Sequence, residues 1–315
     1  MVRVSVVIIT FNGEPWIRQC LLSLRTSTIK SHVIVVDNAS SDNTVQLIEK
    51  EFPEVDLIKE GTNFGFGIAN NIGICRAIEL SSQYVFLLNQ DAYVTAYTLE
   101  ELLNFLDEYP KFGIASPLHC SPDLEHIDLK TYRGYLRTYA VSALCDATLG
   151  RLQPYYQVYG INAAAWLVRT DVFKTVGGFD PVYFMYGEDD DLIARFNLHS
   201  ISFALLTHSK FVHLRESVTP SHTLSYWSCI KRDAVKNRAM LIGSIKHSHF
   251  SKVHTVLTLI SQGLIRPFSD FLIDRNLQGY FSSIVAFFQL LKDLPRIRRH
   301  ALLCATVGPH FLEQI

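Results

Sequence analysis

Residues 188–191 read Glu-Asp-Asp-Asp and are the most distinctive chemical feature of the sequence. Carboxylates packed into one helical turn raise one another's pKa, which suits a general base that works near neutral pH. Acids at a helix N-terminus can instead simply complement the helix dipole. The mostly aromatic residues 183–186 directly before the cluster indicate a partly buried site. We therefore predict that Asp189 and Glu188 are catalytic residues.

Asp91 follows an apolar run and Asn89-Gln90, at a position where a strand-end carboxylate could hold a divalent cation. Mg²⁺ and Mn²⁺ favour oxygen ligands and often take only one or two carboxylates, with phosphate and water completing the shell. His213, after the apolar pair 211–212, is a candidate second ligand or a hydrogen-bond donor to a diphosphate. Asp91 could instead be the solvated end of a strand, and His213 could be a structural histidine.

Asp37 closes the apolar run 33–36, where its carboxylate could accept a hydrogen bond from the N–H of a pyrimidine ring. Thr10, Phe11 and Asn12 end another apolar run, and we expect them to stack on and bond to the same base. Asp37 can equally well cap the turn that follows it through an Asx interaction. The first interpretation requires that the ends of these strands lie close together.

Apolar runs and helical patterns alternate from residue 4 to residue 91. This rhythm predicts parallel strands joined by crossover helices, with helices on both faces of the sheet. In such sheets, ligands bind beyond the carboxyl ends of the strands. Asn12, Asp37, Asn63 and Asp91 each follow a strand or lie in the loop after one, so we predict one shared site. The expected strands are 4–10, 33–36 and 84–88; the expected helices are 14–24, 42–51 with Ser41 as N-cap, and one that follows the turn 63–67 and runs to about 80.

The architecture is expected to change near residue 218, beyond which strand signals fade. Asp191 and Arg195 lie four residues apart on the predicted acidic helix, so we expect them to pair. The elements expected in this part of the chain are strands 163–168, 203–206 and 211–212, and helices 188–198, 225–246, 252–272 and 277–294.

Composition favours a folded chain with two unlike parts. Hydrophobic residues make up 48% of the sequence, enough to bury a full core. The overall net charge is −1, but residues 211–315 contain 13 Lys/Arg against 6 Asp/Glu.

Six cysteines without paired spacing favour a reducing compartment over a zinc or disulfide framework. The apolar run 4–9 is too short for a signal peptide. Arg266 and Asp270 interrupt the best candidate span, 253–273, so we expect no transmembrane helix.

Six segments resemble, in order and spacing over roughly residues 1–217, those of family 2 glycosyltransferases, especially a bacterial rhamnosyltransferase-like branch. A matched order of several segments is far more specific than any single motif. The segments are Val-Ile-Ile-Thr-Phe-Asn-Gly (7–13), Val-Ile-Val-Val-Asp-Asn-Ala-Ser-Ser-Asp (33–42), Asn-Phe-Gly-Phe-Gly-Ile-Ala-Asn-Asn (63–71), Leu-Leu-Asn-Gln-Asp-Ala (87–92), Val-Gly-Gly-Phe-Asp (176–180) and Tyr-Gly-Glu-Asp-Asp-Asp-Leu (186–192).

The resemblance implies a GT-A fold, which is an α/β, Rossmann-like mixed sheet with helices on both faces, followed here by a C-terminal helical region. The catalytic domain would be 1–218, with a nucleotide-sugar half (1–118) and an acceptor half (119–218), and the helical extension 219–315. The implied reaction is inverting, metal-dependent transfer of a sugar, with rhamnose as one candidate, in cell-surface polysaccharide synthesis. The implied donor is a UDP- or dTDP-sugar, and the acceptor a hydroxyl of a glycan or a lipid-linked saccharide.

By motif position, Asp91 is the metal-binding acid for Mg²⁺ or Mn²⁺, and Asp189 is the base. The segment His213–Ser217 matches the place where relatives supply a metal-coordinating histidine. Two residues depart from the usual pattern, because Asn89 replaces the first acid of the DxD-like motif and Gln90 replaces the proline that usually follows it. The predicted nucleotide-binding residues are Thr10, Phe11, Asn12, Glu14, Asp37, Asn38, Asn63, Gly65, Asn71, Asn89 and Gln90.

A basic cluster of Lys292, Arg296, Arg298 and Arg299 follows the apolar stretch 284–291. It fits an anionic membrane surface that carries a lipid-linked acceptor, and it fits equally well the solvated end of a packed helix. We expect a cytoplasmic protein in peripheral contact with the inner face of the membrane, and no nucleic-acid partner.

Two other classes of protein share parts of this pattern. An NAD-dependent Rossmann oxidoreductase has the same βαβ rhythm, but its fingerprint glycines follow the first strand, where only Gly13 occurs. Gly65 and Gly67 come too late in the chain to replace them. A non-catalytic nucleotide-sugar-binding homologue would keep the fold without turnover. The intact pair of Glu188 and Asp189 favours an enzyme.

Overall fold

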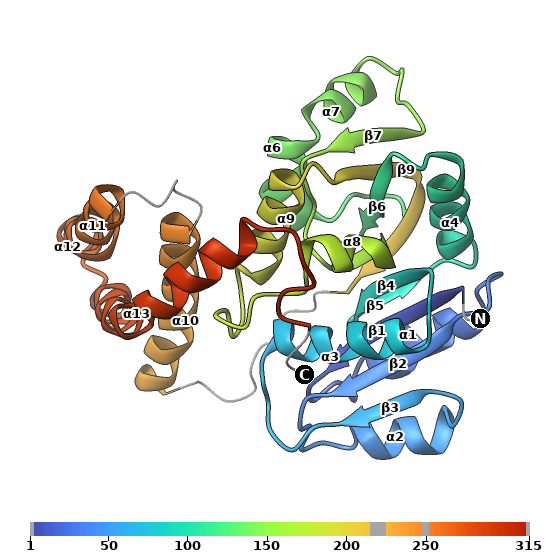
Figure 1. Ribbon diagram of the computed structural model, residues 1–315, viewed down its shortest axis with the longest axis horizontal. Coiled ribbons are helices and arrows are strands. Elements are labelled where there is room, and N and C mark those ends of the chain that lie inside the picture. Colours follow the sequence, from blue (N-terminus) through green and yellow to red (C-terminus); the bar gives the residue numbers. More distant parts are fainter. Residues whose placement is uncertain (1–2, 215–224, 247–251, 313–315) are drawn as a thin grey trace.

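The computed structural model describes residues 3–214, 225–246 and 252–312, which are the coloured parts of Figure 1. The domain boundary predicted near residue 218 lies outside the described residues and stays a prediction. Ser217, the last residue of the predicted His213–Ser217 segment, also lies outside them.

A nine-stranded sheet forms the centre of the described structure. Its strands are β1 (Val4–Thr10), β2 (His32–Asp37), β3 (Asp56–Lys59), β4 (Tyr84–Asn89), β5 (Ala92–Val94), β6 (Phe112–Cys120), β7 (Tyr155–Val158), β8 (Ala165–Arg169) and β9 (Ser202–His213). They lie in the order β3-β2-β1-β4-β8-β6-β9-β5, with β7 paired to β9. The first four of these run parallel, as the alternating pattern predicts. Because β8 is antiparallel to β4 and β6, the sheet is mixed.

Side chains of the central strands alternate between two cores, so helices cover both faces of the sheet. The helices of this part are α1 (Ile17–Arg25), α2 (Thr44–Glu51), α3 (Phe66–Glu79), α4 (Thr98–Glu108), α5 (Leu129–Thr131), the π-helical turn η1 (Tyr132–Leu136), α6 (Arg137–Tyr139), α7 (Val141–Thr148), α8 (Thr170–Val176) and α9 (Glu188–Leu198). Val4, Val6 and Ile8 pack with α1, α2 and α4, whereas Val7 and Ile9 pack with α3, α8 and α9. The predicted two-sided cover is therefore confirmed.

One continuous strand, β9, replaces the pair of strands predicted at 203–206 and 211–212. Its two parts pair with consecutive residues of β6, and the intervening residues 207–209 are passed over in that pairing. The last part of β9 also pairs with β5, so that His213 lies opposite Ala92, the residue after Asp91. Beyond the residues that β6 passes over, β9 continues to His213, which lies beside the residues that follow β4.

Helix α2 begins at Thr44, so the prediction of Ser41 as its N-cap is wrong. The Thr44 N–H donates to Asp42 Oδ1 at 3.1 Å. Because the Asp42 side chain already accepts a hydrogen bond from the first free amide of α2, the helix begins after Asp42 and does not need Ser41 as its N-cap.

The C-terminal helices form a lobe beside the sheet, on the side of α9 (Figure 1). They are α10 (Tyr226–Lys246), α11 (Lys252–Ile260), the π-helical turn η2 (Ser261–Ile265), α12 (Arg266–Asp274) and α13 (Leu277–Cys304). α13 extends past the predicted end at residue 294 and contains Pro295. Proline costs a helix one backbone hydrogen bond. Burial of Ile297, Ala301 and Cys304 beyond it offsets that loss.

After α13 the chain returns to the sheet domain. The Gly308 N–H donates to the Thr175 carbonyl oxygen, and the Gly178 N–H to that of His310, both at 2.9 Å. Leu312 is buried in the core between the sheet and α3. The predicted extension is therefore packed into the catalytic part at its far end.

By length and composition alone, one stretch of the described helices, Thr255–Asp274, could cross a membrane. It contains Arg266 and Asp270, on which the expectation of no transmembrane helix rests. Most of its residues are exposed rather than buried inside the protein. That expectation stays a prediction.

Candidate active site

The carboxyl ends of β1, β2 and β4 meet at one edge of the sheet. In the parallel register Thr10 lies opposite Asp37, and Ile9 lies opposite Asn89. Each strand end begins a loop, so the polar residues that follow the strands are gathered at this edge. The structure thus brings together the strand ends that the sequence predicts to share a site.

A cavity of about 260 Å³ lies over this edge. Its lining includes five of the predicted nucleotide-binding residues, namely Phe11, Asn38, Asn63, Asn89 and Gln90. Trp16, Phe66 and Met185 also line it and were not predicted from the sequence. Apolar residues at helix starts or in loops carry no signal that separates them from core residues. Together the rings and amides offer a stacking surface and hydrogen bonds of both kinds.

Gln90 fastens the loop after β1 to the end of β4. Its Oε1 accepts hydrogen bonds from Thr10 Oγ1 at 2.6 Å and from the Phe11 N–H at 3.1 Å. Its Nε2 donates to the Phe11 carbonyl oxygen at 3.3 Å. A proline at this position has no side-chain amide and could not make these bonds. Gln90, which departs from the family pattern, therefore fixes the backbone of Phe11 at the cavity.

Asp37 is not among the residues that line this cavity, and the surroundings of its two carboxylate oxygens differ. Oδ2 accepts the Ser40 N–H at 3.0 Å, which is the expected turn-capping bond. Oδ1 is buried and has no hydrogen-bond partner among the described residues. A buried carboxylate oxygen without a partner is costly unless a ligand or water completes it.

Several predicted nucleotide-binding residues build loops instead of lining the cavity. Asn12 and Glu14 accept hydrogen bonds from the loop before α2. The buried Asn71 amide bonds the backbone of Phe179 at 2.8 and 2.7 Å. Gly65 has φ +85°, and an added Cβ there would lie 2.0 Å from a backbone oxygen, so this turn requires glycine.

A second cavity, of about 550 Å³, contains the acidic cluster and the predicted metal ligands together. Asp189 and Glu188 enter it from the first turn of α9, Asp91 from the end of β4, and His213 from the end of β9. Asp91 and His213 are 122 positions apart in the chain and meet only through the fold. Asp91 also lines the smaller cavity, so the two cavities adjoin at this carboxylate.

Burial, followed by repulsion from Asp190, raises the pKa of Asp189 to about 6. Hydrogen bonds from the Ala163 N–H and from Asp189's neighbouring backbone act in the opposite direction. Burial and the charge of Asp189 raise the pKa of Glu188 to about 8. Near neutral pH, Asp189 is therefore available as a base while Glu188 holds a proton.

Tyr135, Lys130 and Asn162 also line the second cavity, and the sequence analysis did not identify them. The Tyr135 hydroxyl donates to Asp190 Oδ1 at 3.2 Å and to Asp189 Oδ2 at 3.4 Å. These residues lie between 129 and 162, where no recognised segment occurs. They reach the cavity because α5, η1 and the residues before β8 lie beside the start of α9.

Asp91 and His213 fit a divalent cation. His213 Nε2 and Asp91 Oδ1 lie 3.2 Å apart, and both side chains are largely buried. Two ligands at right angles around an ion with 2.0–2.1 Å bonds would lie about 3 Å apart. Asn89 Nδ2 lies 3.4 Å from the same imidazole nitrogen and so occupies the place of the missing acid. Carboxylate oxygen and imidazole nitrogen are both ligands that Mn²⁺ accepts.

A buried group of ion pairs lies directly behind the acidic turn. Lys246 of α10 donates to Asp180 Oδ2 at 2.6 Å and to Asp191 Oδ1 at 2.5 Å. Arg195 Nε donates to Asp191 Oδ2 at 2.9 Å, which confirms the predicted pair. His300 Nδ1 of α13 lies 2.6 Å from Asp180 Oδ1. The C-terminal helices thus hold the helix that carries Asp189.

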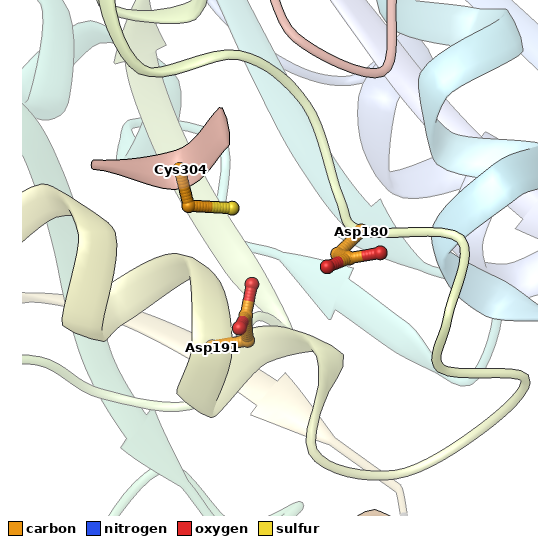
Figure 2. A group of neighbouring side chains, drawn as sticks. All are labelled: Asp180, Asp191 and Cys304. Atoms are coloured by element: carbon orange, nitrogen blue, oxygen red, sulfur yellow. The ribbon is translucent and has the colours of Figure 1, made fainter. Parts of the chain in front are cut away.

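The side chains of Asp180, Asp191 and Cys304 point toward one another and resemble a metal-binding group (Figure 2). Lys246 already places a positive charge between the two carboxylates. Burial lowers the pKa of Lys246, but Asp191 and Asp180 outweigh it and raise that pKa above its ordinary value. Burial also raises the pKa of the Cys304 thiol, which disfavours the thiolate that binds metals. This group is therefore a structural ion-pair cluster.

Residues 5–177 match the family model described as "Glycosyl transferase family 2". The match spans more than half of the chain and includes the ends of β1, β2 and β4. The chain belongs to this family, and the protein is a glycosyltransferase that transfers sugar from a nucleotide-sugar donor.

Curated relatives include several rhamnosyltransferases. The chain is 29% identical over 212 residues to N-acetylglucosaminyl-diphospho-decaprenol L-rhamnosyltransferase of Mycobacterium tuberculosis, covering 59% of this chain and 68% of that protein. It is 25% identical over 210 residues to Rhamnosyltransferase WbbL of Escherichia coli, covering 63% and 78%. It is 24% identical over 272 residues to dTDP-rhamnosyl transferase RfbF of Shigella flexneri, covering 82% and 89%.

Solved structures of Staphylococcus aureus TarS share the fold. Residues 1–349 of TarS in complex with UDP-GlcNAc match 96% of this chain and 88% of that chain, with a TM-score of 0.55 and 18% identity. This likeness identifies the GT-A architecture implied by the family resemblance.

Proposed function

We propose that this glycosyltransferase performs inverting transfer of a rhamnosyl group from a dTDP- or UDP-linked donor to a hydroxyl of a glycan or lipid-linked acceptor, in cell-surface polysaccharide synthesis. The names of the three curated relatives support rhamnose as the sugar. The name of the Shigella relative supports dTDP, and that of the mycobacterial relative supports a lipid-linked acceptor. The observation that carries the proposal is the single cavity shared by Asp91, His213 and Asp189.

In this proposal Asp189 removes the proton from the acceptor hydroxyl as its oxygen attacks the anomeric carbon of the donor. The new C–O bond forms while the bond from that carbon to the diphosphate breaks, and the nucleoside diphosphate leaves with the bonding electrons. Attack from the face opposite the leaving group inverts the configuration. Protonated Glu188 limits the negative charge around the base, and the Tyr135 hydroxyl orients Asp189 and Asp190.

A bound Mg²⁺ or Mn²⁺ supplies charge neutralisation for the departing diphosphate, and Asp91 and His213 are the residues that would hold it. The smaller cavity adjoins Asp91 and would take the nucleoside. Phe11 offers a ring for stacking, and the buried Asp37 Oδ1 needs a hydrogen-bond donor such as a pyrimidine N–H. In this arrangement the diphosphate would lie between the two cavities.

The proposal is tested by the melting temperature of the protein with UDP-, dTDP- and GDP-sugars, each with and without Mn²⁺. At a ligand concentration of 100 Kd, binding stabilises a protein by about 2.7 kcal/mol. We expect dTDP-rhamnose with Mn²⁺ to give the largest rise in Tm. Asp91→Ala should lose the part that depends on Mn²⁺, whereas Asp171→Ala, at an exposed acid outside both cavities, should keep it. Stabilisation by NAD and by no nucleotide sugar would refute the proposal.

A non-catalytic homologue would bind the same nucleotide sugar as an enzyme, so turnover is measured separately from binding. Release of free nucleoside diphosphate from the donor distinguishes the two. An enzyme is expected to show at least slow donor hydrolysis, and a binding module none.

We also propose that the protein is cytoplasmic and contacts the inner face of the membrane peripherally. Lys292, Arg296, Arg298 and Arg299 are exposed on α13, while the opposite side of that helix packs on α10. Exposed basic residues attract anionic lipids in a salt-dependent manner. Co-sedimentation with vesicles that contain phosphatidylglycerol should weaken as NaCl increases. Complete recovery in the soluble fraction of a low-salt lysate would contradict this placement.

A further inference from the structure

A third cavity, of about 790 Å³, lies between the loop before α9 and the C-terminal helices. It is lined partly by Tyr186, Gly187 and Asp190, and the same three residues line the cavity that contains Asp189. The two cavities are thus neighbours across one loop and the first turn of α9. None of the predicted nucleotide-binding or metal-binding residues lines the third cavity, so the donor proposed above leaves it free.

The lining combines an aromatic ring with side chains that donate and accept hydrogen bonds. Tyr186 is 43% exposed, and Lys236 Nζ of α10 lies 5.0 Å from the centre of its ring. Gln262, Arg266 and Asp270 contribute an amide, a guanidinium and a carboxylate from the opposite wall. Saccharide hydroxyls are both donors and acceptors, and the apolar face of a sugar ring packs on an aromatic ring. The cavity therefore has the chemistry of a saccharide site.

The wall formed by α11, η2 and α12 has three distinct faces. Gln262, Arg266 and Asp270 are spaced four residues apart, so they share the face toward the cavity. Thr258, Leu259 and Gly263 are buried on a second face, and the buried Pro267 lies where that face meets the cavity, which it also lines. A third face is an exposed apolar stripe, defined by Val253, Leu257, Ile260, Leu264, Phe268 and Leu272.

The apolar stripe needs a covering that the described chain does not supply. Its side chains are 38% to 67% exposed, and Phe268 alone is 52% exposed. Exposed apolar surfaces of this extent mark sites of contact with other apolar groups. The stripe and the polar wall belong to the same helical stretch, so one ligand with a polar head and an apolar chain could contact both.

We propose that the third cavity is the acceptor subsite, and that it takes a saccharide carried on a long apolar chain. This inference rests on the proposed function. The saccharide lies against Tyr186 and the wall of Gln262 and Arg266, with its reactive hydroxyl directed past Asp190 toward Asp189. The apolar chain lies along the stripe. The C-terminal helices then determine which acceptor the enzyme accepts, while the sheet domain determines the donor.

Gly243 of α10 allows a sharp test because it lines the cavity without any close neighbour. A Cβ added there meets nothing nearer than the Tyr183 hydroxyl, at 4.0 Å. Gly243→Leu therefore places a side chain inside the cavity without a clash at its Cβ, and it also replaces a residue that weakens a helix by one that favours it. Gly243→Ala makes the same backbone change with almost no filling and is the matched control.

The probe is N-acetylglucosamine linked through a diphosphate to a farnesyl chain, and the donor is dTDP-rhamnose. Gly243→Leu is expected to raise the KM for the probe at least tenfold, and to leave donor hydrolysis and the KM for the donor unchanged. Gly243→Ala should behave as the wild type. An unchanged KM for the probe in Gly243→Leu would overturn the assignment of this cavity.

Phe268→Ser tests the apolar stripe separately. It should raise the KM for the farnesyl probe several-fold and have no effect on reaction with free N-acetylglucosamine, which has no chain. If the wild type hydrolyses the donor but neither binds nor uses the farnesyl probe, the proposed acceptor class is wrong. If no variant binds or hydrolyses any nucleotide sugar, the proposed function itself has failed. The two failures are therefore distinguishable.

Discussion

Asp189→Asn is expected to lower kcat by about 10²- to 10⁴-fold, which is the usual contribution of a positioned general base. Asparagine has nearly the same shape as aspartate and its side-chain oxygen can still accept the Ala163 N–H. It cannot take up the acceptor's proton. Binding of the nucleotide sugar, measured as the rise in Tm, should remain within error of the wild type because the donor does not depend on this group.

The pH dependence of kcat/KM provides a second test of Asp189 as the base. The base works when deprotonated, and the pKa of Asp189 is raised to about 6. The kcat/KM of the wild type should therefore rise with pH through about 6 and level off above it. This rise should disappear in Asp189→Asn.

Asp190→Asn is the matched control for Asp189→Asn. It removes one charge from the same turn and the same Tyr135 hydroxyl contact, but at an exposed residue. We expect it to lower kcat far less than Asp189→Asn does and to move the rise of kcat/KM to lower pH, because the charge of Asp190 helps to raise the pKa of Asp189. Equal activity of the wild type and Asp189→Asn would exclude Asp189 as the base.

Lys246→Met is expected to lower the free energy of unfolding by about 3–5 kcal/mol, the usual cost of removing one partner from a buried ion pair. Lys246 lies between Asp180 and Asp191, and all three side chains are buried. Without the ammonium group these two carboxylates would repel each other in a region that water does not reach. Urea denaturation followed by circular dichroism measures the change.

Lys231→Met, at an exposed lysine of the same helix, is the control and should change stability by less than about 0.5 kcal/mol. Lys246→Met combined with Asp180→Asn should recover part of the loss, because one of the uncompensated charges is removed. If Lys246→Met is as stable as the wild type, the cluster does not hold α9 in the way described.

The first half of the sheet could be predicted from the sequence for a physical reason. Strands buried on both faces, such as β1 and β4, read as nearly continuous apolar runs, and polar residues follow them. That is enough to place Asp37, Asn89 and Asp91 at one edge. The indole ring of Trp16 and the thioether of Met185, which line the smaller cavity, could not be found in this way, because nothing in their local pattern distinguishes a cavity wall from a core.

The second half of the sheet was less predictable because its pairing is between distant residues. β8 inserts antiparallel between β4 and β6, and β7 pairs with β9 although it is only four residues long. Such pairings depend on the whole sheet rather than on local periodicity. The polar residues 207–210 interrupt the apolar pattern at the gap in the pairing of β9 with β6, so one strand was predicted as two.

Contacts within one helix were predictable, and contacts between elements were not. Asp191 and Arg195 are four residues apart on α9, and their pairing followed from helix geometry. Lys246 and His300 reach the same cluster from α10 and α13. No spacing rule connects them to Asp180, so the sequence did not show that one acid of the turn, Asp191, is buried and paired with Lys246 while the others face the cavity.

The return of the chain to the sheet after α13 bears on how the protein is made. Leu312 shares a core with Val7 of the first strand, so one hydrophobic layer joins segments from near both ends of this sequence. Contacts over such separations form late, because a long loop must close before they stabilise anything. On the ribosome, the core on one face of the sheet would stay incomplete while the helical lobe is being synthesised. A nascent chain that ends before residue 312 would therefore expose part of that core to chaperones.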